Sequence, residues 1–326
     1  MKRLSIIVPL YDSARFMPKC IESLLQQDIP ADEYEILLIN DGSPDNSEEL
    51  AREYAAEYEN VRVLSKENGG TSSARNMGIS NARGKYLYFV DPDDFIQKNS
   101  LGEILHIMDS ESLDVLRFGY TEVDLNGNQV KSCKHPERPD YSSGIMDGYS
   151  FMAERLGTAC YVWSFLFRTD MIRQNNLFFN EDAYIDDTPW LPQVLALAKR
   201  VDSIGVKRHF YTIREGSLVR AGSENTNKII SAQMWLIKEL ERQMASVENA
   251  KGKLWYDKMV AHTVLSMLSV VGSREYGMKQ QVCSWLVENE ILPLSLRGSV
   301  MRTGIRYILI NISPNMFCDI VHKKHS

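Results

Sequence analysis

Carboxylate side chains follow a buried strand pattern in the first third of the chain. Asp91, Asp93 and Asp94 come directly after the apolar run 86–90. Like charges at one strand end repel one another unless a cation lies between them. Magnesium and manganese ions are usually held by one or two carboxylates together with phosphate oxygens of a substrate. The spacing favours a divalent metal site here, and a solvated acidic turn is the alternative.

A second acidic pair, Asp186 and Asp187, precedes a helical pattern over 187–199. A carboxylate at the mouth of a binding site can act as a general base that removes a proton from an attacking hydroxyl. Either residue could instead simply cap the helix, because aspartate is a preferred residue at a helix N-terminus.

A third segment combines glycine with a cation. Gly69 and Gly70 let the backbone approach a ligand closely, and the helix expected over 72–82 offers amide groups to an anion. Arg75 could pair with a phosphate group or with the aspartates near residue 91. In isolation this pattern is weak.

The elements that would position these residues alternate along the chain. Short apolar runs at 4–9, 35–39, 61–64 and 86–90 read as buried strands, and helical patterns lie between them. This order predicts an α/β fold with a doubly wound, mostly parallel central sheet. Ligands of such sheets lie beyond the carboxyl ends of the strands, where Asp12, Asp41 and Asp91 are expected to meet. Beyond residue 222 the patterns are helical, at 227–244, 254–271 and 280–288.

Composition excludes several classes of protein. The 326 residues suggest about two domains, with 44% hydrophobic and 25% charged residues as in ordinary globular proteins. The net charge of −6 gives no basic footprint for nucleic acid. Five scattered cysteines argue against a disulfide scaffold or a zinc ribbon and fit free thiols in the cytoplasm. No Rossmann glycine fingerprint, Walker A sequence or zinc-protease motif occurs.

Several ordered motifs resemble a known family. The runs LSIIVPLYDSARFMPKCIESLLQQ, EILLINDGSPDNS and NGGTSSARNMGISNARGKYLYFVDPDDF are similar to family 2 glycosyltransferases of fold type A, the nucleotide-diphospho-sugar transferase fold. The resemblance is dense over 4–95 and thinner through 161–168, 186–188 and 211–217. It implies transfer of one sugar, with inversion, from a nucleotide diphosphate donor such as a UDP-sugar to an acceptor hydroxyl in polysaccharide or glycolipid synthesis.

The resemblance also implies roles for individual residues. The implied nucleotide-binding set is Pro9, Tyr11, Asp12, Asp41, Asn68, Gly69, Arg75 and Asp91. Asp93, with Asp91 and Asp94 beside it, would bind a manganese or magnesium ion. Asp187 takes the position of the general base, and Asp186 stands where the family usually has glutamate. Arg214 and Arg220 could fold over the diphosphate as a lid, or could be solvated arginines.

The expected domain organisation follows these motifs. Residues 1–222 would form the catalytic domain, with a nucleotide-binding part at 1–110 and an acceptor part at 111–222, and 223–326 would form a helical extension. Residues 297–326 hold five lysines and arginines against one aspartate among apolar residues. This segment could lie peripherally on the inner face of an anionic membrane near a lipid-linked acceptor. Packing on the catalytic domain or on a second subunit of a homodimer is the alternative.

Three rival functions use the same residues differently. A phosphoryl-transfer enzyme of the haloacid dehalogenase kind also has Asp-x-Asp after a strand, but usually after its first strand. A sugar nucleotidyltransferase needs a glycine-rich loop after the first strand, where this chain has Asp12-Ser13-Ala14-Arg15. A non-catalytic binding module could keep the fold, although the intact Asp91, Asp93 and Asp187 argue against it.

Overall fold

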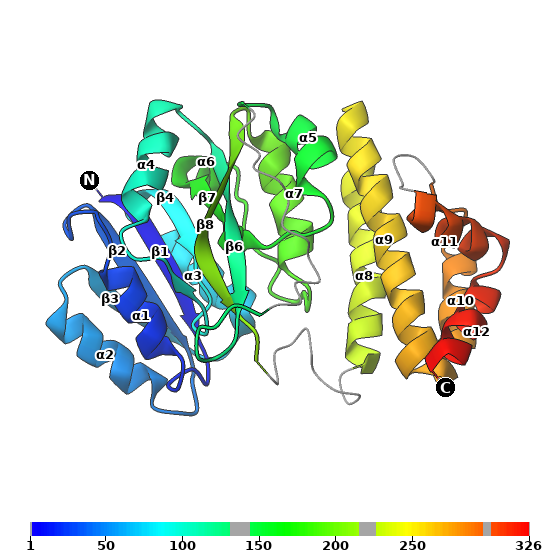
Figure 1. The fold of residues 1–326 in the computed structure, drawn as a ribbon, viewed down its shortest axis with the longest axis horizontal. Coiled ribbons are helices and arrows are strands. Elements are labelled where there is room, and N and C mark those ends of the chain that lie inside the picture. Colours follow the sequence, from blue (N-terminus) through cyan, green and yellow to red (C-terminus); the bar gives the residue numbers. More distant parts are fainter. Residues whose placement is uncertain (1, 131–143, 215–225, 296–300, 326) are drawn as a thin grey trace. The chain divides into compact units, whose positions relative to one another are not determined.

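The computed structural model describes residues 2–130, 144–214, 226–295 and 301–325 (Figure 1). The chain divides into two compact units. The first comprises 1–151 and 160–214, and the second comprises 152–159 and 215–326. The boundary expected at 222/223 falls among residues 215–225, which lie outside the described residues. The sequence did not predict that 152–159 would join the second unit.

The first unit is built around an eight-stranded sheet in the order β3-β2-β1-β4-β7-β6-β8-β5. The strands are β1 (Lys2–Leu10), β2 (Tyr34–Asp41), β3 (Val61–Lys66), β4 (Gly84–Phe89), β5 (Phe95–Ile96), β6 (Val115–Val123), β7 (Phe165–Arg168) and β8 (Val201–Thr212). β1 to β4 are parallel to one another, whereas β7 runs antiparallel to both β4 and β6. β6 and β8 are parallel, and β5 is antiparallel to β8. The predicted parallel sheet is confirmed for the first half, and the second half is mixed.

Helices cover both faces of this sheet. They are α1 (Met17–Leu25), α2 (Ser47–Glu57), α3 (Gly70–Asn81), α4 (Leu101–Ser110), α5 (Gly148–Phe151), α6 (Thr169–Gln174) and α7 (Asp187–Leu197), with a short 3₁₀ turn at Val162–Ser164. α1, α2 and α4 share one core cluster with β1, β2 and β4. α3 and α6 pack against the strands as well, and Trp190 of α7 contacts the rings of Phe89 and Phe167. Every residue of β2 is buried, as expected of a strand covered on both faces.

β8 is the strand that the sequence pattern did not reveal. Its residues are only partly buried at most positions, so no continuous apolar run marks it. Its pairing with β6 also shifts register on both sides of Gly119. A bulge of this kind breaks the alternation on which strand prediction depends. Serine is a residue type that often caps helices, but Ser13 does not cap α1. The helix begins at Met17, and the Ser13 hydroxyl bonds the backbone of Tyr11.

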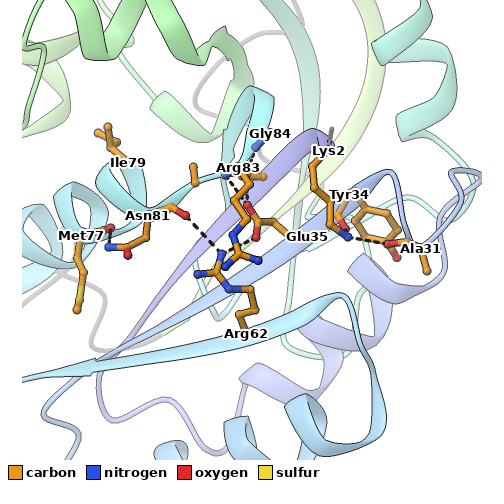
Figure 2. Close-up of polar contacts among 12 residues, drawn as sticks. Lys2, Ala31, Tyr34, Glu35, Arg62, Met77, Ile79, Asn81, Arg83 and Gly84 are labelled. Carbon is orange, nitrogen blue, oxygen red and sulfur yellow. Dashed lines mark hydrogen bonds and ion pairs between the residues drawn. The ribbon is translucent and has the colours of Figure 1, made fainter.

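The amino end of the parallel strands is held by a buried polar network (Figure 2). Glu35 of β2 is fully buried and accepts hydrogen bonds from Ser5 Oγ, Arg62 Nη1 and the Arg83 amide, each at 2.6 Å. Ser5 Oγ in turn accepts from the Gly84 amide at 2.8 Å. A buried carboxylate is tolerated when its lone pairs are satisfied in this way. The network joins β1, β2 and β4 at the end opposite the predicted site.

The second unit is helical. Its helices are α8 (Thr226–Ala245), α9 (Ala250–Arg274), α10 (Lys279–Glu288), α11 (Met301–Ile312) and α12 (Pro314–His325), with a 3₁₀ turn at Tyr276–Met278 and a π-helical turn at Met152–Leu156. The π-helical turn packs on α9, where Trp255 Nε1 donates to the Gly157 carbonyl at 2.9 Å. Within the described residues, no helix combines the length and apolar character needed to cross a bilayer. The described cysteines are buried free thiols.

Candidate active site

The end of β1 carries three of the predicted nucleotide-binding residues. Pro9 is buried within the strand and pairs with Ile39, whereas pairing of β1 with β4 extends only to Ile7. Proline has no amide proton, so Pro9 cannot donate the hydrogen bond that a further pair between β1 and β4 would need. Beyond the strand, Tyr11 is 53% exposed and Asp12 has a left-handed φ of 48°. Tyr11 and Asp12 therefore reach the surface, and Pro9 does not.

Asp41, at the end of β2, caps the start of α3. Its carboxylate accepts from the amides of Gly69 at 2.9 Å and Gly70 at 2.7 Å, and from Lys66 Nζ at 2.8 Å. Asn68 donates to the Asp41 carbonyl at 3.1 Å. The structure thus brings together Asp41, Asn68 and Gly69, three of the predicted nucleotide-binding residues. The helix begins at Gly70, two residues before the expected start, and the amides of Gly69 and Gly70 bond the Asp41 carboxylate.

Arg75, in the second turn of α3, joins the two acidic clusters. Its guanidinium donates to Asp91 Oδ1 at 3.1 Å, Asp186 Oδ2 at 2.9 Å and Asp187 Oδ1 at 2.8 Å. The side chain is only 5% exposed, and its cation lies 5.4 Å from the ring centroid of Phe179. Of the two partners considered for Arg75, a phosphate group or the aspartates near residue 91, the structure shows the pairing with an aspartate. It also places the start of α7 against the end of β4.

The two carboxylates at the start of α7 have different surroundings. Asp186 Oδ2 accepts from both Ser72 Oγ and Arg75, each at 2.9 Å. Asp187 accepts from Arg75 and, through Oδ2, from the Val162 amide at 3.3 Å. Burial raises the pKa of Asp187 well above its ordinary value, although Arg75 opposes this shift. A raised pKa suits a general base that works near neutral pH.

Asp91 and Asp93 lie at the other side of Arg75. Burial raises the pKa of Asp91 and repulsion from Asp93 adds to the rise, while Arg75 opposes it. Asp93 forms an ion pair with Arg214, whose cation also lies 5.0 Å from the ring centroid of Phe16. Arg214 therefore contacts the predicted metal carboxylate directly. Arg220, the other predicted lid residue, lies outside the described residues.

Asp94, which was predicted to lie beside the metal ligands, occupies an internal position. It is 1% exposed, and its oxygens accept from the Thr212 amide and contact His209 Nε2, both at 2.8 Å. His209 Nδ1 contacts the Tyr88 hydroxyl at 2.8 Å. Burial lowers the pKa of His209 to about 3, so the ring is neutral, and burial raises the pKa of Asp94. Through these two contacts, Asp94 links β8 to the Asp-x-Asp loop.

Aromatic rings stack beside the Asp187 carboxylate. Trp163 stacks on Tyr161 at 4.9 Å, on His209 at 4.6 Å and on Tyr211 at 5.3 Å between ring centroids. The amide of Val162, between the first two of these residues, bonds Asp187. The sequence predicted neither this stack of rings nor a role for His209. The six histidines show no ligand spacing, and the residues of the stack come from distant segments of the chain.

The residues present fit a metal ion that is held jointly with a substrate. No group of three or more histidine, cysteine or acidic residues suited to a metal occurs within the described residues. A nucleotide-bound magnesium or manganese ion needs only one or two carboxylates, which Asp91 and Asp93 supply. In the described part of the chain, two arginines pair with four carboxylates: Arg75 and Arg214 with Asp91, Asp93, Asp186 and Asp187. The excess of two negative charges favours a divalent cation.

This combination of a parallel half, a mixed half and carboxylates at the strand ends defines a type A nucleotide-diphospho-sugar transferase fold. The chain belongs to glycosyl transferase family 2, whose family model matches residues 5–174. The predicted family and fold are thereby confirmed. The described metal and base roles of single residues stay predictions.

Known proteins support this placement. The chain is 33% identical over 226 residues to the uncharacterized glycosyltransferase EpsJ of Bacillus subtilis, a match covering 66% of this chain and 62% of EpsJ. It therefore spans less than two thirds of that relative. The structure of Staphylococcus aureus TarS 1-349 in complex with UDP-GlcNAc matches 99% of this chain and 91% of that one, with a TM-score of 0.70 and 19% identity.

A second solved structure has the same fold. The mannosyltransferase PcManGT from Pyrobaculum calidifontis, in complex with GDP-Man and Mn²⁺, matches 99% of this chain and 86% of its own, with a TM-score of 0.56 and 12% identity. TarS is also similar in sequence, at 28% identity over 222 residues covering 66% of this chain and 36% of TarS, and is named as a poly(ribitol-phosphate) beta-N-acetylglucosaminyltransferase.

Proposed function

We propose that the protein is an inverting glycosyltransferase that moves a single sugar from a UDP-sugar to an acceptor hydroxyl in polysaccharide or glycolipid synthesis. The observation that carries this proposal is the Arg75 cluster. It holds Asp91, from the expected donor-binding loop, and Asp187, the expected base, on one guanidinium. Donor and acceptor chemistry would then meet within one partly buried cluster, which favours transfer between them.

The donor nucleotide would lie along the ends of β1 and β2. Tyr11 and Asp12 are placed at the surface there, and Asp41 holds the turn formed by Asn68 and Gly69. The TarS complex with UDP-GlcNAc supports a uridine donor for this chain. Asp91 would contact the ribose and the diphosphate.

A manganese or magnesium ion would bind to Asp93 and Asp91 and stabilise negative charge on the departing diphosphate. The complex of PcManGT with Mn²⁺ supports this assignment. Arg214 neutralises Asp93 in the structure. Its guanidinium would be free to pair with the donor diphosphate when another cation takes its place at Asp93.

Asp187 would accept the proton of the acceptor hydroxyl. The acceptor oxygen forms a bond to the anomeric carbon from one face, and the bond from that carbon to the diphosphate oxygen breaks on the other. The proton moves to Asp187, and the electron pair leaves with the nucleotide diphosphate. Asp186 would fix the geometry through its bonds to Arg75 and Ser72.

A thermal-shift measurement with uridine diphosphate tests the donor site. At a ligand concentration of about 100 times the dissociation constant, binding stabilises the folded protein by about 2.7 kcal/mol. We expect a rise in melting temperature that needs manganese and is lost in Asp93→Asn. The matched control is Asp182→Asn, which alters an exposed carboxylate in the loop before α7.

Two outcomes would contradict the proposal. Folded protein that shows no shift with any nucleotide would overturn the donor site. A shift without release of uridine diphosphate from any UDP-sugar, with or without acceptor glycans, would leave a nucleotide-sugar binding module instead of an enzyme.

A further inference from the structure

The last two helices carry an unusual exposed surface. The described side chains of α11 and α12 run from Thr303 to His325. Those that are exposed are Ile305, Arg306, Ile308, Ile312, Met316, Ile320, Lys323, Lys324 and His325. Each is apolar or basic, and none is acidic. Ile312 is 69% exposed and Ile305 is 55% exposed.

The exposed apolar residues follow helical spacing. Ile305, Ile308 and Ile312 lie three and four residues apart on one face of α11, and Met316 and Ile320 lie four apart on α12. The opposite faces supply buried residues such as Tyr307 and Phe317. Both helices therefore have two apolar faces, of which only one packs against the unit.

Packing inside the unit fixes these helices firmly. α12 approaches α9 closely at Gly272, where an added Cβ would lie 2.7 Å from Val321 Cβ. Asp319, the aspartate of α12, pairs with Lys279 Nζ at 2.8 Å and accepts from the Tyr276 hydroxyl. Its negative charge is thus compensated within the unit, and the exposed face keeps the positive charges of Arg306, Lys323 and Lys324.

We propose that this face of α11 and α12 docks on an anionic lipid bilayer, with the isoleucines in the acyl boundary and the basic side chains at the headgroups. Amphipathic helices with apolar and Lys/Arg faces bind in this manner, and binding depends on anionic lipid. The chain as a whole carries a net charge of −6, so the positive charge of this face is a local feature that attracts an anionic partner.

A second copy of this chain fits the face less well. A two-fold interface places the same patch on both subunits, so both sides would carry the same three basic residues and none of the described exposed residues opposite them would be acidic. Like charges brought together at a desolvated interface disfavour association. Arg306, Lys323 and Lys324 therefore oppose self-association, whereas an anionic lipid surface attracts them.

Co-sedimentation of the full chain with vesicles tests this proposal. One set contains phosphatidylglycerol and phosphatidylcholine in equal parts, and the other contains phosphatidylcholine alone. We expect binding to the anionic set that weakens with added salt. Each basic residue near an anionic surface contributes about 1 kcal/mol, or about fivefold in partitioning, so Lys323→Gln with Lys324→Gln should reduce binding about 25-fold.

The apolar contribution is tested by Ile305→Asp with Ile312→Asp, which should abolish sedimentation with vesicles. Leu125→Asp is the matched control, because Leu125 is an exposed apolar residue of the first unit. The melting temperature of each variant shows whether it is folded, and the UDP-induced shift should be unchanged in all. Vesicle binding and nucleotide binding can therefore fail independently.

The remaining outcomes overturn the proposal. They are equal binding to both sets of vesicles, binding that survives Ile305→Asp with Ile312→Asp, and no binding to either set. A dimer in solution that the isoleucine variants dissociate would assign the face to a second copy. Binding to an acidic protein in place of anionic vesicles would assign it to a protein partner.

Discussion

The two ends of the central sheet both hold carboxylates that are at least partly buried, but the charge of these carboxylates is compensated differently. At the amino end, Glu35 is fully buried and forms an ion pair with Arg62 (Figure 2). Its carboxylate also accepts hydrogen bonds from Ser5 Oγ and the Arg83 amide. At the carboxyl end, two arginines serve four carboxylates, as described above. The charge of Glu35 at the amino end is therefore balanced by an arginine, whereas the carboxylates at the carboxyl end outnumber their arginines.

This difference distinguishes structural polar groups from functional ones. A satisfied buried network stabilises one arrangement of strands and offers nothing to a ligand. A crowded set of carboxylates costs stability, because burial and repulsion disfavour their charged forms. Such sites persist where the charge is needed to bind a ligand or to accept a proton. The raised pKa values of Asp91 and Asp187 are the local sign of that cost.

Replacing Asp187 is the strongest test of the comparison. Because a positioned general base contributes about 10²–10⁴-fold to rate, Asp187→Asn should reduce sugar transfer by about that factor. The pKa of Asp187 is raised in the folded protein, so its charge opposes folding above the unfolded pKa of about 3.9, and increasingly so as the pH rises. We therefore expect the variant to be at least as stable as the wild type at neutral pH. Turnover of a UDP-sugar and the melting temperature measure the two effects.

Asp182→Asn is the control for this test, since it removes an exposed carboxylate from the same loop. It should leave both rate and stability unchanged. If Asp187→Asn transferred sugar at the wild-type rate, Asp187 would not be the base. A clear loss of stability would show that its bond to Arg75 stabilises the fold. The carboxylates at the carboxyl end would then be structural, like Glu35 at the amino end.

Replacing Glu35 should have the opposite pattern. Glu35→Gln keeps the oxygen that faces Ser5 Oγ and Arg83 but sets an amide donor against Arg62. A buried donor left unsatisfied costs about 1–3 kcal/mol, so the free energy of unfolding should fall by that amount. Urea unfolding measures the loss, and uridine diphosphate should bind the folded variant as before.

The half-exposed Glu33, which pairs with Arg3, provides the matched control. Exposed ion pairs contribute about 0–1 kcal/mol, so Glu33→Gln should have little effect on unfolding. Weaker nucleotide binding in folded Glu35→Gln would couple the two ends of the sheet and contradict the separation drawn here.

The sequence predicted what local patterns encode. The parallel strands β1 to β4 and the carboxylates at their ends follow from short apolar runs and the residues after them. The pairing of Arg75 with the aspartates near β4 was one of two alternatives that the sequence left open. β8 escaped prediction because its residues are mostly half-buried and its register with β6 shifts. The bonds between His209 and Asp94 and between Ser72 and Asp186 join residues more than 110 positions apart. Such pairings arise from topology, so no spacing along the chain reveals them.

The smallest expected effect concerns Asp109, another carboxylate at the amino end. Burial raises the pKa of Asp109, but hydrogen bonds from Lys85, Arg3 and Tyr86 outweigh it and lower the pKa to about 2. The unfolded value is about 3.9, so this carboxylate stabilises the fold above about pH 4 and the contribution is lost as the pH falls toward 2. Its side chain is 32% exposed, which limits the contribution to less than about 1 kcal/mol.

Asp109→Asn should therefore lower the free energy of unfolding slightly at neutral pH, and the difference from the wild type should shrink as the pH is lowered through about 4 toward 3. Urea unfolding at a series of pH values measures this convergence, with the exposed Asp32→Asn as the control. Asp187→Asn should diverge from the wild type in the opposite sense, gaining relative stability as the pH rises. A difference for Asp109→Asn that is constant with pH would mean that its bonds do not depend on charge, and the amino end would then be held by packing and neutral hydrogen bonds alone.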